Sequence, residues 1–129
     1  MTYLICTGVL VLLYFALALN VSRMRGATKT GIGSGDDPSG PLNKAVRAHG
    51  NAAEYVPLAL ILIGTLEIAG AGRPLLHGLG ATLTAARLLH AQGISSTLGT
   101  SPGRVVGTLL TWLVYLVGAG ACLYYATIA

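Results

Sequence analysis

Charged side chains are scarce in this sequence. They make up 9% of its 129 residues, and only four of them are acidic. Ordinary soluble domains carry about 25% charged residues. Hydrophobic residues make up 53% of the chain, and the mean hydropathy is +0.71. The composition therefore excludes an ordinary water-soluble domain and indicates an integral membrane protein.

Cysteine and histidine are also rare. The two cysteines, Cys6 and Cys122, are too few for a disulfide framework, and each is typical of a small packed hydrophobe. His49 and His90 lack a third ligand at a suitable spacing, so no metal site is predicted. Basic residues do not alternate with aromatic ones, which argues against a nucleic-acid partner.

Four long apolar stretches are present, at residues 3–21, 46–69, 75–91 and 105–128. A bilayer core of ~30 Å requires about 20 helical residues, and 17–25 are tolerated. Strands of a membrane barrel would be shorter and would alternate strictly. The sequence predicts a single all-α domain over residues 1–129, an up-down bundle of four transmembrane helices.

Basic residues indicate how the helices are oriented. They follow the first apolar stretch and do not precede it, which is typical of a retained helix and not of a cleaved signal peptide. The second loop holds only Arg73 and the third ends at Arg104. The first loop holds Arg23, Arg25, Lys29 and Lys44. We therefore expect loops one and three in the cytoplasm and both termini on the opposite side.

The second apolar stretch opens on a polar motif. Arg47, Asn51 and Glu54 are spaced i, i+4, i+7, so they lie on one helical face over two turns. Charges inside a membrane helix are expensive and usually mark a functional site.

In an up-down bundle these residues share one level with other polar side chains near loops one and three. The set is Arg23, Arg25, Arg47, Asn51, Glu54, Arg87, His90 and Arg104. Arginines at helix ends could simply extend to the membrane surface, and one Arg–Glu pair could be structural. A structural pair would still leave an arginine without a partner, which favours a ligand site.

The excess charge at this level is positive. Ser101 and Pro102 are typical of a helix N-cap and first helical residue, which adds partial positive charge beside Arg104. The complementary ligand is a small polyanion that also carries an amine, whose ammonium would bind Glu54. Glutathione, with two carboxylates, one ammonium and a thiol, has this pattern.

At these positions the sequence resembles the MAPEG family, the membrane-associated proteins of eicosanoid and glutathione metabolism. The similarity is carried by Arg47-Ala48-His49 with Asn51 and Glu54, and by Ala86-Arg87-Leu88-Leu89-His90. Pro102-Gly103-Arg104 and Arg23-Met24-Arg25 match two further helix ends. The resemblance covers nearly the whole chain.

The resemblance implies a homotrimer that binds glutathione between subunits near the cytoplasmic face, with Arg104 holding the thiolate. The implied binding residues are Arg23, Arg47, His49, Asn51, Glu54, Arg87 and His90. Gly50, Ile94, Val105 and Thr108 replace polar or aromatic residues of the prostaglandin synthase branch. Eicosanoid substrates are therefore not expected, and the chain looks like the short prokaryotic members.

We therefore expect a glutathione-dependent transferase or peroxidase in a prokaryotic inner membrane, acting on a lipophilic electrophile. One alternative is a non-catalytic membrane scaffold that binds glutathione or another anion. Another is a small multidrug exporter, but such a transporter needs a carboxylate in its first helix, and residues 3–21 contain none.

Overall fold

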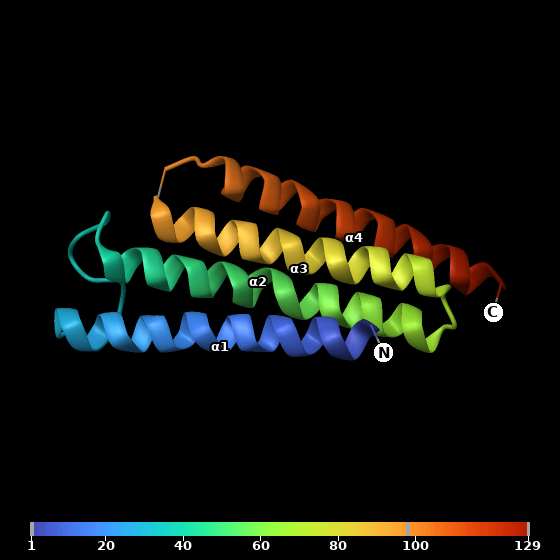
Figure 1. The fold of residues 1–129 in the computed structure, drawn as a ribbon, viewed down its shortest axis with the longest axis horizontal. Coiled ribbons are helices and arrows are strands. Elements are labelled where there is room, and N and C mark those ends of the chain that lie inside the picture. The colour runs from blue at the N-terminus through green and yellow to red at the C-terminus, as the bar shows by residue number, and fades with distance from the viewer. Residues whose placement is uncertain (1, 98, 129) are drawn as a thin grey trace.

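The computed structural model describes residues 2–97 and 99–128 as an up-down arrangement of helices (Figure 1). The α1–α2 and α3–α4 connections lie at one end, and both termini lie at the other with the α2–α3 turn. We refer to these as the loop end and the terminal end. The helices are α1 (Thr2–Thr28), α2 (Pro41–Ile68), α3 (Arg73–Ser96) and α4 (Pro102–Ile128).

Proline and glycine set several of the helix boundaries. A proline occupies the first or second position of α2 and α3, where a missing N–H costs nothing. Pro102 begins α4 in the same way. After α2, Gly70 has a φ of 79°, and the Ala71 amide donates to the Leu66 carbonyl at 2.9 Å. This left-handed residue closes α2 in a Schellman motif and starts the tight turn into α3.

Each helix continues beyond its apolar stretch. The first was predicted over 3–21 but extends to Thr28, and the second begins at Pro41 instead of residue 46. Hydropathy marks only the segment suited to hydrocarbon, whereas a helix continues until a glycine, a proline or a lost backbone hydrogen bond ends it. Pro57 lies inside α2, where it removes one backbone donor without ending the helix.

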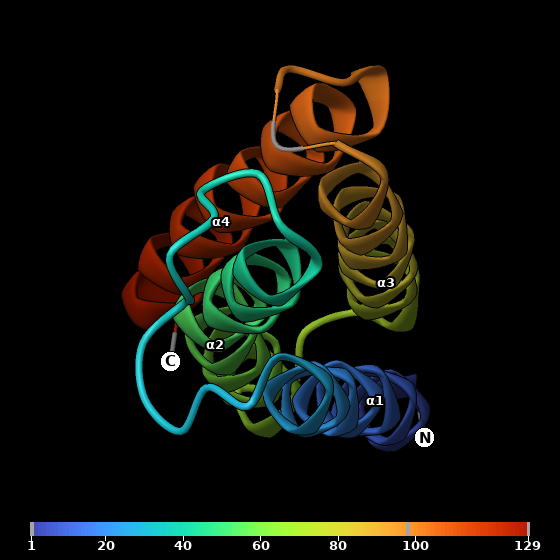
Figure 2. The same cartoon turned by 90° about the vertical axis from the view of Figure 1, so that its left-hand side faces the viewer.

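Within the described residues, three helices, α1, α2 and α4, are long and apolar enough to cross a membrane by length and composition. The remaining helix, α3, carries Arg87 and His90 and packs against all three others. Figure 2 shows α3 lying between α1 and α4 on one side of α2. Among the described residues, α1 and α4 do not touch. The helix α2 also packs against all three others, so less of α2 and α3 than of α1 and α4 is available to face lipid.

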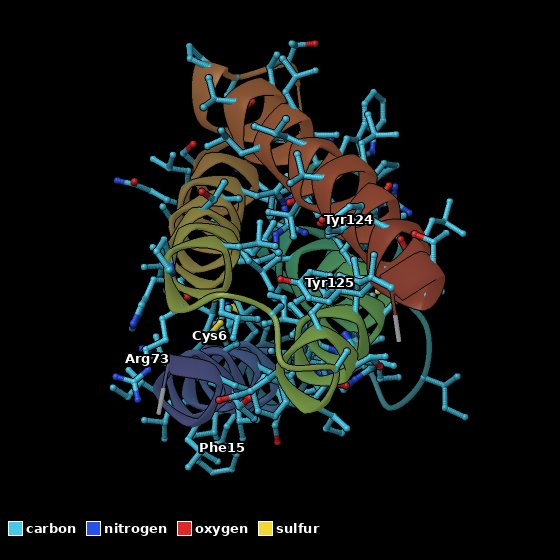
Figure 3. The ribbon with its side chains drawn as sticks, turned by 90° about the vertical axis from the view of Figure 1, so that its right-hand side faces the viewer. Cys6, Phe15, Arg73, Tyr124 and Tyr125 are labelled. Atoms are coloured by element: carbon cyan, nitrogen blue, oxygen red, sulfur yellow. The ribbon has the colours of Figure 1, made fainter. Side chains whose placement is uncertain are left out.

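The outer surface of the bundle is apolar. Phe15 points away from the bundle, while Cys6 lies between α1 and α3 (Figure 3). The Cys6 thiol donates to the Gly80 carbonyl at 3.5 Å. At the terminal end, the Gly72 amide donates to the Tyr125 hydroxyl at 3.3 Å and links the α2–α3 turn to α4. Exposed Leu, Val and Phe with a buried inner face are what a lipid-embedded bundle requires.

Glycines allow α3 and α4 to touch backbone to backbone at the loop end. A Cβ on Gly107 would lie 2.5 Å from the Ala86 carbonyl oxygen, and one on Gly103 would lie 2.8 Å from the Leu89 carbonyl oxygen. Gly93 meets the start of α4 in the same way. Small residues at such positions let membrane helices approach closely. This contact fixes the position of the α4 N-terminus beside the last turns of α3.

Because Gly107 lies against the backbone of α3, adding a single methyl group there should destabilise the fold. Gly107→Ala should push α3 and α4 apart and lower the free energy of unfolding by ~1–3 kcal/mol, because the added carbon meets backbone atoms. Gly120→Ala is the matched control in the same helix, since nothing lies within 4 Å of its added Cβ. Thermal unfolding in detergent measures both variants. Equal melting temperatures would contradict the contact.

Candidate functional site

A buried arginine lies at the centre of the polar region. Arg87 on α3 has only 3% of its surface exposed. Its Nη1 donates to Asn51 Oδ1 on α2 at 2.9 Å, and its guanidinium lies 5.5 Å from the centre of the Tyr55 ring. Its Nε is buried, and no described residue accepts a hydrogen bond from it. The side chain therefore keeps an unused Nε–H donor in a low-dielectric environment.

Two tyrosines support this arginine and tie α4 to α2. The Tyr115 hydroxyl donates to the Tyr55 backbone carbonyl at 2.7 Å. The two rings are stacked with centroids 6.2 Å apart. The face of Tyr55 is thereby held against the Arg87 guanidinium, where the ring quadrupole attracts a cation.

No carboxylate neutralises Arg87 within the described residues. Glu54, one turn beyond Asn51 on α2, is exposed and pairs with none of the described arginines. The structural Arg–Glu pair considered from the sequence is therefore not formed within this chain. The neutral amide of Asn51 satisfies one donor but leaves the positive charge of Arg87 in place.

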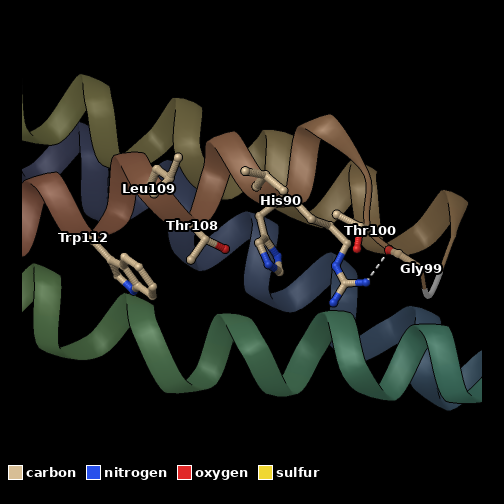
Figure 4. A pocket seen from close by; sticks show the side chains of 8 residues that line it. His90, Gly99, Thr100, Thr108, Leu109 and Trp112 are labelled. Carbon is tan, nitrogen blue, oxygen red and sulfur yellow. Dashed lines mark hydrogen bonds between the residues drawn. The ribbon is translucent and has the colours of Figure 1, made fainter.

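A second group of residues lines a cavity at the start of α4. The cavity has a volume of about 460 Å³ (Figure 4). Arg104 Nη1 donates to the Gly99 carbonyl at 2.6 Å. The Arg104 amide is capped by Ser101 Oγ at 3.4 Å, so the predicted N-cap is confirmed. The lining residues are His90, Gly99, Thr100, Arg104, Val105, Thr108, Leu109 and Trp112.

The structure brings the predicted residues together only in part. Asn51 and Arg87 are in contact, and His90 and Arg104 line one cavity. Arg87 and His90 are three residues apart on α3, so these two groups are neighbours along one helix face.

Other predicted residues lie apart from these contacts. Arg23, Arg47 and Glu54 are exposed on α1 and α2. The His49 ring lies 4.5 Å from Tyr14 on α1, and within this chain it is not part of the Arg87–Asn51 group.

Three aromatic residues near the site were not predicted from the sequence. Tyr55 follows Asn51 by four residues and could have been added by extending the helical face. Trp112 follows Arg104 by eight residues, again on one face of a helix. No local sequence pattern indicated that Tyr115 lies near the site, because its contact with Tyr55 depends on how α4 crosses α2.

The fold and this polar end define a multi-pass, all-helical membrane protein with a group of cationic side chains near one end of the bundle. Its sequence matches the MAPEG family over residues 3–124. It is 34% identical over 114 residues to "Inner membrane protein YecN" of Escherichia coli strain K12, with 88% of this chain and 84% of the relative covered. The same protein from strain CFT073 matches equally well.

The chain belongs to the MAPEG family, and its fold is the family's four-helix membrane bundle. The expected class and integral membrane location are thereby confirmed, the relative itself being named as an inner membrane protein.

The Arg87–Asn51 pair predicts non-additive stability. Asn51→Leu should lower the free energy of unfolding by ~1.5–3 kcal/mol, because it leaves a buried charged donor without a partner. Arg87→Met should also destabilise the fold, by removing the partner of Asn51. The double variant Asn51→Leu/Arg87→Met should be more stable than Asn51→Leu, since both polar groups are then absent. Thermal unfolding gives the double-mutant cycle, and simple additivity would contradict the pairing.

Proposed function

We propose that this protein is a membrane-bound transferase or peroxidase that uses glutathione to attack a lipophilic electrophile. The observation that carries the proposal is the buried Arg87. Among the described residues it contacts no carboxylate, its Nε donor is unused, and the neutral Asn51 is its only side-chain hydrogen-bond partner. An unpaired cation in a membrane protein is costly, and an anionic ligand would relieve that cost.

The charges around Arg87 fit glutathione. Its two carboxylates match the arginine surplus at the loop end, which Arg23, Arg47 and Arg104 supply together with Arg87. Its ammonium matches Glu54, which has no arginine partner among the described residues. Arg47 and Glu54 are exposed in the single chain, which supports a site completed by a second subunit in a homotrimer, as the family resemblance implies.

Arg104 and the first turn of α4 would supply the electrostatic part of catalysis. A close cation and a helix N-terminus both favour a thiolate over a thiol. Glutathione would bring the thiol, whose proton leaves to water. In conjugation, the sulfur lone pair then forms a bond to the electrophilic carbon of a substrate that arrives through the lipid. A leaving group departs with its bonding electron pair, or the π bond of an activated alkene opens and its carbon takes a proton from water. No protein general base is required, because the thiol is already ionised.

One observation favours the scaffold alternative. Arg104 Nη1 donates to the Gly99 carbonyl in the α3–α4 connection at 2.6 Å, so part of this guanidinium already holds the loop in place. If that were its whole role, the protein would bind glutathione or another anion without activating it. The role of Arg104 therefore separates the enzyme from the scaffold.

Ligand binding should depend on Glu54. We expect Glu54→Gln to weaken glutathione binding roughly 10- to 150-fold, because a charge-assisted hydrogen bond of ~1.5–3 kcal/mol is lost. Glu67→Gln, near the other end of α2, is the control and should bind normally. Calorimetry measures both variants, with subunit mass determined in mild detergent. Unchanged affinity in an intact trimer would assign Glu54 a structural role.

Catalysis should depend on Arg104. The pKa of the bound glutathione thiol should lie about two units below the ~8.5 of a free thiol. Arg104→Ala should raise it again with little change in affinity, since the other arginines hold the carboxylates. A pH titration of the thiolate ultraviolet absorption measures this pKa.

The thiol titration also decides between the two candidate functions. If glutathione bound to the wild-type protein titrates like free glutathione, the enzyme hypothesis is contradicted and the scaffold hypothesis is favoured. A pKa that is lowered equally in wild type and Arg104→Ala would keep the enzyme but remove Arg104 as its thiolate-binding residue.

A further inference from the structure

Trp112 is the chain's single tryptophan, and it lies in an unusual place for a membrane protein. Tryptophans of membrane helices concentrate at the headgroup level near the helix ends. Trp112 is three residues from the middle of α4 (Pro102–Ile128), or about 5 Å along the axis. Tyr124 and Tyr125 occupy the terminal end of this helix instead. Anchoring at the interface therefore does not account for Trp112.

Trp112 lines the same cavity as Arg104. Residues 104, 108 and 112 follow at four-residue spacing, so they lie along one side of α4. Figure 4 shows the side chains of His90, Thr108 and Trp112 directed toward the same side. Half of the Trp112 surface is exposed, which leaves the indole accessible. About 12 Å of helix separates Arg104 from Trp112, and the lining changes from cationic to apolar along this length.

Resting on the proposed function, we propose that Trp112 selects the electrophile: it binds planar, electron-poor aromatic substrates in preference to aliphatic ones. An electron-poor ring stacks on the electron-rich indole in an offset arrangement. The cavity volume of about 460 Å³ is within the range of small-molecule sites, ~300–1,000 Å³. Aliphatic substrates gain contact with Val105 and Leu109 but no stacking.

The geometry also places the reacting carbon. With its ring on Trp112, a substituted dinitrobenzene would direct its halogen-bearing carbon toward Thr108 and Arg104, where the thiolate is held under the proposed function. The sulfur lone pair forms the new carbon–sulfur bond at the ring carbon that carries the halogen. The carbon–halogen bond breaks, and the halide leaves with the bonding electron pair. The charge that develops on the ortho nitro group, beside the reacting carbon, would lie near the cationic end of the cavity.

The first test uses Trp112 as its own fluorescent reporter and requires no glutathione. The probe is m-dinitrobenzene, which has no leaving group and quenches indole fluorescence on contact. In the full-length protein in detergent, we expect saturable quenching. The control Trp112→Phe/Leu116→Trp moves the reporter one turn along α4, to a side chain that is 74% exposed and outside the cavity lining. Its half-quenching concentration should be at least fivefold higher. Equal or non-saturable quenching in both proteins would overturn the proposal.

The second test compares substrates. Trp112→Leu should lower kcat/KM for chlorodinitrobenzene roughly tenfold, the scale of one aromatic stacking contact, and leave a medium-chain alkenal within about twofold. Trp112→Phe should keep most of the aromatic preference. Equal losses for both substrates would mean that Trp112 only supports the fold, and would overturn the proposal.

The two tests separate this proposal from the function on which it rests. Saturable quenching at Trp112 in a protein that neither binds glutathione nor turns over either substrate would retain an aromatic binding site and reject the glutathione transferase. Turnover with equal preference in wild type and Trp112→Leu would retain the transferase and reject Trp112 as its selector.

Discussion

The cost of burying a guanidinium in a membrane protein is the constraint on which the loop end of this bundle depends. An unpaired arginine at the centre of a membrane helix costs ~2.5–3.5 kcal/mol on insertion scales. Arg87 is 3% exposed, and the chain meets that cost with a neutral amide and an aromatic face instead of a carboxylate. Asn51 and Tyr55 must therefore both face α3, which fixes the rotation of α2 about its axis. Tyr115 then fixes where α4 crosses α2, because its hydroxyl donates to the Tyr55 carbonyl.

The pairing of Arg87 with an amide differs from an ordinary ion pair in the charge that remains. A carboxylate beside Arg87 would neutralise the charge and accept up to two of its N–H groups, which leaves less attraction for an anionic ligand. An amide fills one donor and keeps the electrostatic potential positive. Arg47 and Glu54 are exposed on α2, the helix that carries Asn51, and they extend this polar surface outward to the edge of the single chain. The inner end of this polar group is thus built by packing within one chain, and its outer end is exposed.

Much of the fold could be predicted from the sequence, because lipid imposes simple rules on segment length and hydropathy. The four helices, the polar end and the N-cap at Ser101 follow from local patterns. The shared helical face of Arg47, Asn51 and Glu54 could also be predicted, but the residues that it contacts on other helices could not. Whether Glu54 or Asn51 meets Arg87 depends on a few tens of degrees of rotation of α2, which neighbouring helices decide. His49 illustrates the same limit, since its contact with Tyr14 depends on how α1 packs.

The contact between α3 and α4 has a mechanical consequence. Gly93, Gly103 and Gly107 bring two backbones together, so the separation of these helices does not depend on any side-chain rotamer. A backbone contact leaves little room for adjustment, whereas near Arg87 the helices α4 and α2 meet through the aromatic rings of Tyr55 and Tyr115. The polar end thus combines a tight backbone contact between α3 and α4 with a side-chain contact between α4 and α2. The backbones at His90 and Arg104 are therefore held close together by the glycine contacts, whereas the distance from Arg104 to Asn51 depends on how these rings pack.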